Sequence, residues 1–146
     1  MRDSIIIPDE SAMAAFASRL AGRAVAGDAI LLSGPLGAGK STFARAFIRA
    51  VAGDPALEVP SPTFTLVQSY ETKSGSIAHF DLWRLNGPAA LEELGWDEAQ
   101  AGIVLVEWPD RLGGLTPDTA LHIAISLNPA GREITLHGQN RWFDAS

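Results

Sequence analysis

Along the chain, short apolar runs alternate with stretches in which the apolar residues have helical spacing. Residues 4–7 form an apolar run that predicts a strand. Residues 8–11 are typical of a helix start, because their acidic side chains suit the positive end of a helix dipole. A second buried strand is predicted over residues 28–33. The apolar positions between these strands are spaced like one helical face: Met13, Phe16, Leu20 and Val25.

A second helical pattern follows a glycine-rich turn. Phe43, Ala46, Phe47 and Ala50 predict its buried stripe, and Gly53 is expected to end it. This order of strand, turn and helix is typical of the first unit of a parallel sheet.

The middle of the chain changes to the alternation of a strand. Residues 61–70 are predicted to be extended, residues 73–76 to turn, and residues 77–83 to pair back as the second half of a hairpin. Residues 87–94 predict a short helix that ends at Gly95.

Residues 103–106 have the most apolar strand pattern, and we expect this strand at the centre of the sheet. Residues 122–127 and 133–138 predict a second hairpin around the turn at 128–131. Strands and helices alternate early, and strands accumulate later. We therefore predict an α/β fold with a parallel core, added antiparallel strands and helices on both faces of the sheet.

Composition narrows the class of protein. Hydrophobic residues make up 47% and charged residues 19%, which suits one globular domain over residues 1–146. The absence of cysteine excludes disulfides and thiolate metal sites. No apolar run approaches the roughly 20 residues that span a bilayer. Since the first residues also lack the pattern of a signal peptide, we expect no membrane contact and a cytoplasmic location.

The chain is acidic, with a formal net charge of -6 and a pI of about 4.9. Lys40 and Lys73 are the two lysines of the sequence, and no run of basic residues occurs. Such a chain is repelled by a phosphodiester backbone. Any link to nucleic acid is therefore expected to pass through another protein.

Residues 34–41, GPLGAGKS, match the P-loop pattern G-x-x-x-x-G-K-[ST] in full. The glycines allow the backbone to wrap a phosphate chain with its N–H groups pointing inward, and the following helix directs the positive end of its dipole to the same place. Lys40 is predicted to neutralise the β and γ oxygens, and the Ser41 hydroxyl to ligate Mg²⁺. The sheet is therefore expected to be that of a P-loop NTPase.

Such a site also needs an acid at the end of a neighbouring strand. Glu107 follows the apolar run at 103–106 and is the candidate. His79 and Asp81 lie two apart on a predicted strand, so they share a face. No third ligand is visible nearby, so we do not expect this pair to hold a metal ion. Three roles stay open for Asp81: it could orient the attacking water, support the Mg²⁺ shell or simply lie on a polar surface of the strand. Trp83 and Trp108 are expected to be core residues.

Four segments, GPLGAGKST, SPTFTLVQSY, HFDLWRL and VLVEWPDRL, occur together in an order and spacing that resemble the TsaE (YjeE) family. The resemblance covers nearly the whole chain. It implies a Mg²⁺-dependent ATPase of tRNA threonylcarbamoyladenosine biosynthesis that forms ADP and phosphate, slowly without its partners. Those partners are TsaB and TsaD, which modify adenosine 37 of tRNA, so that tRNA is met only through the complex.

The resemblance also implies roles for individual residues. Ser41 and Glu107 would be the Mg²⁺ ligands, and Asp81 and Glu107 the catalytic candidates. Residues 61–63 would form a switch-like loop near the γ-phosphate, while Ser11 and Arg132 would lie on the adenine side. The residues expected to bind the nucleotide are Ser11, Gly34, Leu36, Gly37, Ala38, Gly39, Lys40, Ser41, Thr42, Thr63 and Arg132.

Some features depart from the family or leave other functions open. Family members commonly carry Asp, Thr and Tyr where this chain has Pro35, Ser41 and Trp83; serine keeps the ligating hydroxyl, whereas Trp83 lacks a phenolic oxygen. A small-molecule kinase would need an Arg-rich lid, which is not visible after Glu107, and a GTPase would need an N-K-x-D motif, which is absent. A nucleotide-dependent binding module without turnover stays an alternative, because hydrolysis depends on positioning that spacing does not show.

Overall fold

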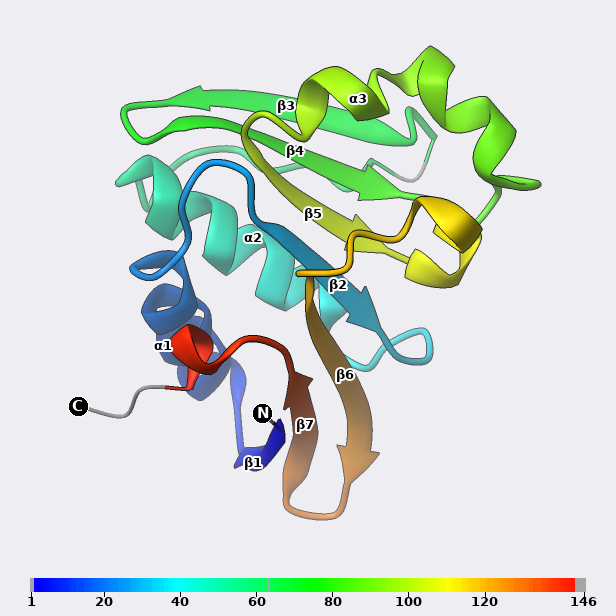
Figure 1. The fold of residues 1–146 in the computed structure, drawn as a ribbon. Helices are drawn as coiled ribbons and strands as arrows, with labels where there is room; N and C mark the ends of the chain where they lie inside the picture. Colours follow the sequence, from blue (N-terminus) through cyan, green and yellow to red (C-terminus); the bar gives the residue numbers. More distant parts are fainter. Residues whose placement is uncertain (1, 63, 144–146) are drawn as a thin grey trace.

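The computed structural model describes residues 2–62 and 64–143, and its central feature is a seven-stranded sheet (Figure 1). The strand order is β1-β7-β6-β2-β5-β4-β3. The bounds are β1 Arg2–Ile7, β2 Ala29–Ser33, β3 Val67–Thr72, β4 Gly75–Asp81, β5 Ile103–Glu107, β6 Leu121–Asn128 and β7 Gly131–His137. Strands β6, β2, β5 and β4 are parallel, and β1, β7 and β3 are added antiparallel. The predicted mixed sheet with a parallel core is confirmed.

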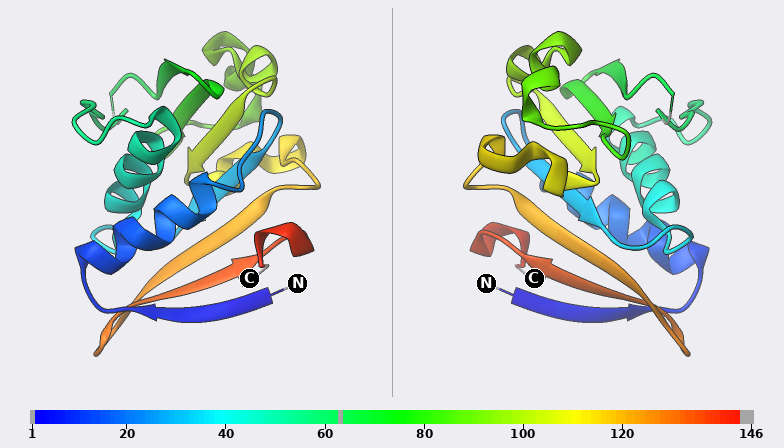
Figure 2. Two further views of the ribbon diagram at one scale, coloured as in Figure 1. Left: turned by 90° about the vertical axis from the view of Figure 1, so that its left-hand side faces the viewer. Right: turned by 90° about the vertical axis from the view of Figure 1, so that its right-hand side faces the viewer.

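Helices cover both faces of this sheet, as predicted. Helices α1 (Glu10–Ala21) and α2 (Lys40–Ala52) lie together on one face, and the short α3 (Trp96–Ala99) lies on the other, with the 3₁₀ helices η1 (Pro88–Leu94) and η2 (Pro109–Leu115) (Figure 2). Each face has its own cluster of buried apolar side chains. No helix within the described ranges is long and apolar enough to cross a membrane.

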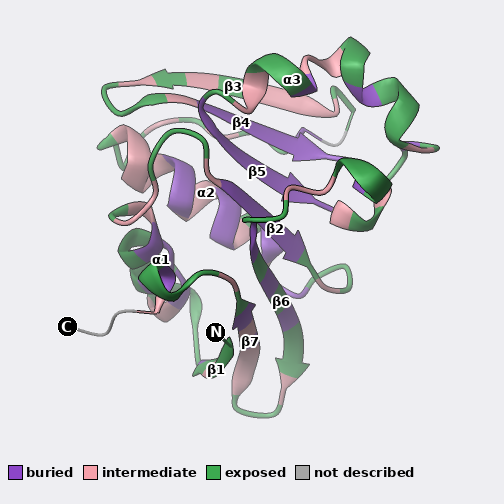
Figure 3. Cartoon of the chain, in the orientation of Figure 1, coloured by how far each residue is buried: buried purple, intermediate pink, exposed green. Residues whose placement is uncertain are grey.

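The interior strands β2, β5 and β4 are almost entirely buried (Figure 3). Strand β5 is inside the sheet, but the middle position belongs to β2, so the expectation that residues 103–106 lie at the centre is wrong by one strand. Strands β2 and β5 are both covered on both faces of the sheet, and strands in such positions are typically apolar along their length. Apolarity therefore marks an interior strand without giving its place in the order.

Helix α1 begins where the sequence predicts, because the Asp9 carboxylate accepts a hydrogen bond from the backbone N–H of Ala12 at 2.8 Å. The helix ends at Ala21, however, and Val25 lies beyond it with 59% of its surface exposed. Val25 instead belongs to a turn in which its N–H donates to the Asp28 carboxylate. The remaining apolar positions of the predicted face are buried: Met13, Phe16 and Leu20.

Helix α2 ends at Gly53, as predicted, and this glycine adopts a left-handed conformation with φ 67°. Phe43 and Phe47 are fully buried, in agreement with the predicted stripe. Ala46 and Ala50 are only half-buried, so the stripe is rotated by part of a turn relative to the prediction.

The middle of the chain differs most from the prediction. Strand β3 begins only at Val67, because Leu66 has a left-handed backbone with φ 68° that interrupts an extended chain. The following hairpin is confirmed, with Thr72 opposite Gly75 at the turn. Strand β4 ends at Asp81, two residues before the predicted end, and Trp83 is 43% exposed rather than part of the core.

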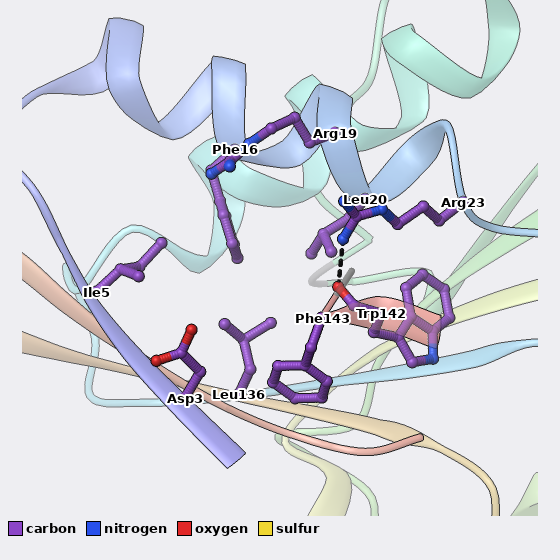
Figure 4. Close-up of a pocket in the computed structure, with 9 residues that line it drawn as sticks. All are labelled: Asp3, Ile5, Phe16, Arg19, Leu20, Arg23, Leu136, Trp142 and Phe143. Atoms are coloured by element: carbon purple, nitrogen blue, oxygen red, sulfur yellow. Dashed lines mark hydrogen bonds between the residues drawn. The ribbon is translucent and has the colours of Figure 1, made fainter. Parts of the chain in front are cut away.

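The C-terminal hairpin of β6 and β7 is confirmed, and the chain then returns to α1 through the short helix η3 (Asn140–Trp142). An Arg23 Nη1 N–H donates to the Trp142 carbonyl beside a cavity of about 110 Å³ (Figure 4). Arg141 forms an ion pair with Asp28, which directly precedes β2. The last described turn is thereby attached to the segment that follows α1 and to the start of a central strand.

Candidate functional site

The ends of three parallel strands meet at one edge of the sheet and bring the predicted site residues together. In the register of the sheet, Glu107 of β5 lies between Leu32 of β2 and Asp81 of β4. The loop of residues 34–39 leaves β2 at the same edge and leads into α2 (Figure 1). In open α/β sheets this edge, at the carboxyl ends of the strands, is where ligands bind.

The loop has a backbone that requires glycine. At Gly34, φ is 146° and a Cβ atom would lie 2.3 Å from the carbonyl oxygen of Ile125 in β6. Gly37 and Gly39 also have positive φ, at 80° and 114°. Ala38 is buried between them, whereas Leu36 is 84% exposed at the outer turn. The glycines of the motif therefore serve the shape of the loop, as the sequence predicts.

Lys40 is the first residue of α2, and its side chain is buried, with 5% of its surface exposed. Its Nζ lies 3.9 Å from the centroid of the Trp108 ring and has no hydrogen-bond partner among the described residues. Burial lowers the pKa of this ammonium below its ordinary value, and the charges of Glu107, Asp81 and Asp110 offset only part of the effect. Lys40 is thus a desolvated cation held over an aromatic face, with its hydrogen-bonding capacity unused.

Asp81 and Glu107 are both buried beside one another, with 6% and 4% of their surfaces exposed. Burial raises the pKa of the Asp81 carboxyl, and the neighbouring Glu107 charge raises it further. The backbone N–H of Trp83, at 3.4 Å from Asp81 Oδ1, and the charges of His79 and Lys40 act in the opposite direction. The pKa of the Asp81 carboxyl therefore lies above that of an ordinary exposed aspartate.

The structure also brings in a residue that the sequence interpretation set aside. His79 is 2% exposed, and its Nε2 lies 2.8 Å from Oε2 of Glu107. Since a carboxylate only accepts, the imidazole donates through Nε2. Its Nδ1 has no hydrogen-bond partner among residues 2–62 and 64–143. The alternation of β4, which places His79 on the face of Asp81, was the available signal; the pairing with Glu107 needs the strand order.

Trp108 has a strained backbone directly after Glu107. Its φ is 59°, a left-handed conformation that costs a non-glycine residue about 1–2 kcal/mol. The chain turns here, and the indole packs against the core on one side and faces Lys40 on the other. Trp108 is therefore both a partial core residue, as predicted, and part of the wall of the site.

The predicted switch-like loop, residues 61–63, is followed by a residue, Leu66, that is bonded both to this loop and to the end of β4. The Leu66 carbonyl accepts from the Asp81 N–H at 2.9 Å, and the Leu66 N–H donates to Pro62 at 2.7 Å. Arg84 donates through Nη2 to the Phe64 carbonyl at 3.1 Å. Thr63, predicted to bind the nucleotide, lies outside the described residues. The segment around it is thus attached directly to the end of β4.

A cavity of about 410 Å³ lies beside the P-loop and is lined in part by Arg132, one of the two residues for which the family resemblance implies a contact on the adenine side. Gly37, Gly39, Thr42 and Arg132 are among the residues that line it. Ser11 is exposed in the first turn of α1, next to the lining residue Glu10. The guanidinium of Arg132, however, is bonded to the carbonyl oxygens of the P-loop.

The side chains at this site could hold a metal ion only if a bound phosphate supplied further oxygen ligands. No group of three or more His, Cys, Asp or Glu side chains in the described parts of the chain is arranged to hold a metal ion. The Ser41 hydroxyl is exposed at the start of α2, and Glu107 has one carboxylate oxygen that is not bonded to His79. One hydroxyl and one carboxylate oxygen fit Mg²⁺, which favours few protein ligands together with phosphate oxygens and waters.

Comparison with known protein families identifies the chain. A sequence model described as "Threonylcarbamoyl adenosine biosynthesis protein TsaE" matches residues 7–134. A protein of Rickettsia felis named tRNA threonylcarbamoyladenosine biosynthesis protein TsaE is 39% identical over 124 residues, which cover 84% of this chain and 72% of the relative. A protein of Haemophilus influenzae with the same name is 33% identical over 143 residues, which cover 91% and 87%.

A solved structure shares the fold. The crystal structure of Bacillus subtilis YdiB matches with a TM-score of 0.73 and 29% sequence identity, and the match covers 98% of this chain and 88% of that one. The mixed sheet and its helices are thus found in a solved structure over nearly the full length.

Proposed function

The chain belongs to the TsaE family, and we propose that it binds ATP and Mg²⁺ at the P-loop and hydrolyses ATP to ADP and phosphate in support of tRNA threonylcarbamoyladenosine formation. The family gives the role in tRNA processing. The nucleotide, the metal and the hydrolysis are proposals that depend on the site.

The proposal depends mainly on one observation. Lys40 is the first residue of α2, and its buried ammonium has no hydrogen-bond partner among the described residues. A buried ammonium without partners is unfavourable, so its position is best explained by a ligand that is polyanionic. A triphosphate supplies such oxygens, and the amides of the loop and the dipole of α2 favour the same charge.

Ser41 and Glu107 would hold Mg²⁺, which when bound neutralises charge on the phosphate oxygens. His79 fixes one oxygen of Glu107 and leaves the other available. Asp81, with its raised pKa and its place beside Glu107, would orient the attacking water or accept its proton. The two acids would therefore contribute more to turnover than to ground-state binding.

The cavity beside Gly37 and Thr42 is proposed for the adenosine part of ATP. Its volume of about 410 Å³ lies in the range of small-ligand pockets. Ser11 is proposed to contribute at its rim. The backbone amides of Leu36, Gly37 and Gly39 and the hydroxyl of Thr42 would meet the phosphates.

TsaB and TsaD are the proposed partners, with tRNA bound through them. Leu36 of the P-loop and Phe64, near the loop that is bonded to β4, are large apolar residues that are 84% and 82% exposed. A partner that covers such side chains would exclude water and order the loop that is attached to Asp81. We therefore propose that ATP hydrolysis is slow for the chain alone.

Single-turnover hydrolysis of ATP by the purified chain tests this proposal, alone, with TsaB and TsaD, and with tRNA alone. The expected result is slow hydrolysis that the two proteins accelerate and that bare tRNA leaves unchanged, with Lys40→Ala as the inactive control. Stimulation by bare tRNA, or no response to TsaB and TsaD, would overturn the partner model. Nucleotide binding without hydrolysis under every condition would favour a binding module, and transfer of phosphate to a small molecule would favour a kinase.

A further inference from the structure

Arg132, the second residue of β7, donates two hydrogen bonds to the P-loop. Its Nε lies 2.8 Å from the carbonyl oxygen of Ala38, and its Nη2 lies 3.2 Å from that of Gly37. Its Nη1 donates to the carbonyl of Gly131 at 3.3 Å. Every nitrogen of the guanidinium is therefore engaged with a main-chain oxygen. The side chain is fixed against the loop and does not extend freely into the cavity.

The sheet brings this arginine to the loop. Strand β6 is parallel to β2, so the turn from β6 to β7 lies at the same edge as the P-loop. Ile134 and Leu136 of β7 are buried on the face that α1 and α2 cover, and Arg132 shares their alternation. At Gly131, φ is 136° and a Cβ atom would lie 2.3 Å from the carbonyl oxygen of Ile7, so a glycine is needed where β7 begins.

The bonded carbonyls belong to two peptide units of the loop, one of which carries a cradle amide. The carbonyl of Gly37 shares a planar peptide with the N–H of Ala38, which donates to the Pro35 carbonyl at 3.1 Å and so closes the turn of the loop. The carbonyl of Ala38 shares a peptide with the N–H of Gly39, which is the amide left for a phosphate oxygen. In a trans peptide these groups point in opposite directions, so Arg132 binds the loop from behind. A charge-assisted bond to the carbonyl polarises the peptide and makes its N–H a stronger donor.

We propose that Arg132 is a positioning residue, which holds the P-loop in its phosphate-binding shape and strengthens the Gly39 amide toward the phosphate chain. This proposal rests on the proposed function, since it takes a polyphosphate as the ligand. It differs from the role that the family resemblance implies for Arg132, which is a contact on the adenine side. The two roles differ in the part of ATP that the arginine recognises.

The test compares two ligands, Mg-ATP and Mg-tripolyphosphate, in calorimetric titrations of the full chain. Arg132→Ala is expected to weaken both ligands by the same factor, about tenfold, which is the loss expected from one net hydrogen bond to a charged group. Arg132→Lys keeps the charge but not the planar fork, and is expected to recover part of both affinities.

Arg49→Ala is the matched control. Arg49 Nε donates to the carbonyl of Leu57 at 2.8 Å, so this variant also removes one arginine and its bond to a main-chain oxygen, but at the far end of α2. It is expected to leave both affinities unchanged, even if it lowers stability. An effect of Arg132→Ala through general destabilisation would appear in Arg49→Ala as well.

Each remaining outcome decides the proposal. A loss for ATP with unchanged tripolyphosphate binding would assign Arg132 to the adenosine and overturn the proposal, as would unchanged binding of both ligands. If Arg132→Ala does not fold, Arg132→Lys alone decides, since an equal partial loss for both ligands supports the proposal and an ATP-only loss or no loss contradicts it. A wild-type chain that binds neither ligand would overturn the proposed function itself.

Discussion

The imidazole Nε2 of His79 lies 2.8 Å from Oε2 of Glu107, and both side chains are almost completely buried. The two residues come from neighbouring parallel strands, in which His79 opposes Leu105 and Asp81 opposes Glu107. The bond therefore runs diagonally across the strand pair. It fixes one oxygen of an acid whose other oxygen is proposed to meet the metal.

His79→Leu is expected to leave the buried Glu107 carboxylate without its donor. The free energy of unfolding should fall by about 1–3 kcal/mol, the cost of an unsatisfied buried group, and partner-stimulated turnover should fall with it. His79→Gln retains an N–H donor and should recover most of both quantities. Urea unfolding and single-turnover hydrolysis measure the two effects. Equal behaviour of the leucine and glutamine variants would show that the hydrogen bond is not what matters.

Lys40→Ala is expected to abolish tight binding of ATP while the chain remains folded. Lys40 is a cation without a hydrogen-bond partner in the described structure, so its removal leaves no described acceptor unpaired. For the nucleotide-free protein we expect Lys40→Met, which keeps the length of the side chain, to be as stable as wild type or more stable. Calorimetric titration and thermal unfolding check both statements, and unchanged ATP affinity would refute the role of Lys40 as a phosphate ligand.

Asp81→Asn and Glu107→Gln are expected to reduce turnover at least a hundredfold and nucleotide affinity much less. Both substitutions keep the shape of the side chain and remove charge that acts on the attacking water or on the metal in the transition state. The ratio of the loss in single-turnover rate to the loss in calorimetric affinity is the measurement. Full partner-stimulated hydrolysis by both variants would show that these acids are not catalytic.

The stability of the chain should decrease in mild acid through His122. His122 is exposed, but partial desolvation of its ring lowers its pKa, and His137, opposite it in the sheet with its ring centroid 6.2 Å away, lowers it further. Because the folded-state pKa lies below the unfolded value of about 6.5, the stabilisation is complete above that value and is lost as the pH falls through the folded-state pKa. Urea unfolding at pH 7.5 and 5.5 should show a smaller loss for His122→Asn than for wild type. If the free energy of unfolding depends on pH identically in both proteins, His122 does not contribute to the loss of stability in acid.

Much of the fold follows from local patterns in the sequence. The P-loop motif identifies the turn between β2 and α2, and apolar spacing finds both long helices and both hairpins. The errors occur where local pattern is not decisive. Alternation at residues 61–66 predicts a strand, but residues 61–62 and 64–66 are not in a strand, because Leu66 is left-handed and is bonded to Pro62 and Asp81. Val25 continues a helical spacing beyond the point where the helix has ended.

The sequence predicts individual residues of the candidate site better than it predicts the contacts between them. A motif gives Lys40 and Ser41, and an acid after an apolar run gives Glu107. The contact of Lys40 with Trp108 and the pairing of His79 with Glu107 depend on strand order and on a left-handed turn. The bonds from Arg132 to the P-loop join residues from distant parts of the chain, and no local pattern encodes them.

The pairing of β1 with β7 has a consequence for synthesis of the chain. Strand β1 is made well before β7, the strand with which it pairs, because residues 8–130 separate the two. At roughly 5–20 residues per second, the isoleucines of β1 remain without that partner for several seconds. The nascent chain therefore carries the isoleucines of β1 unpaired until β7 has been made, and this edge of the sheet cannot form before then.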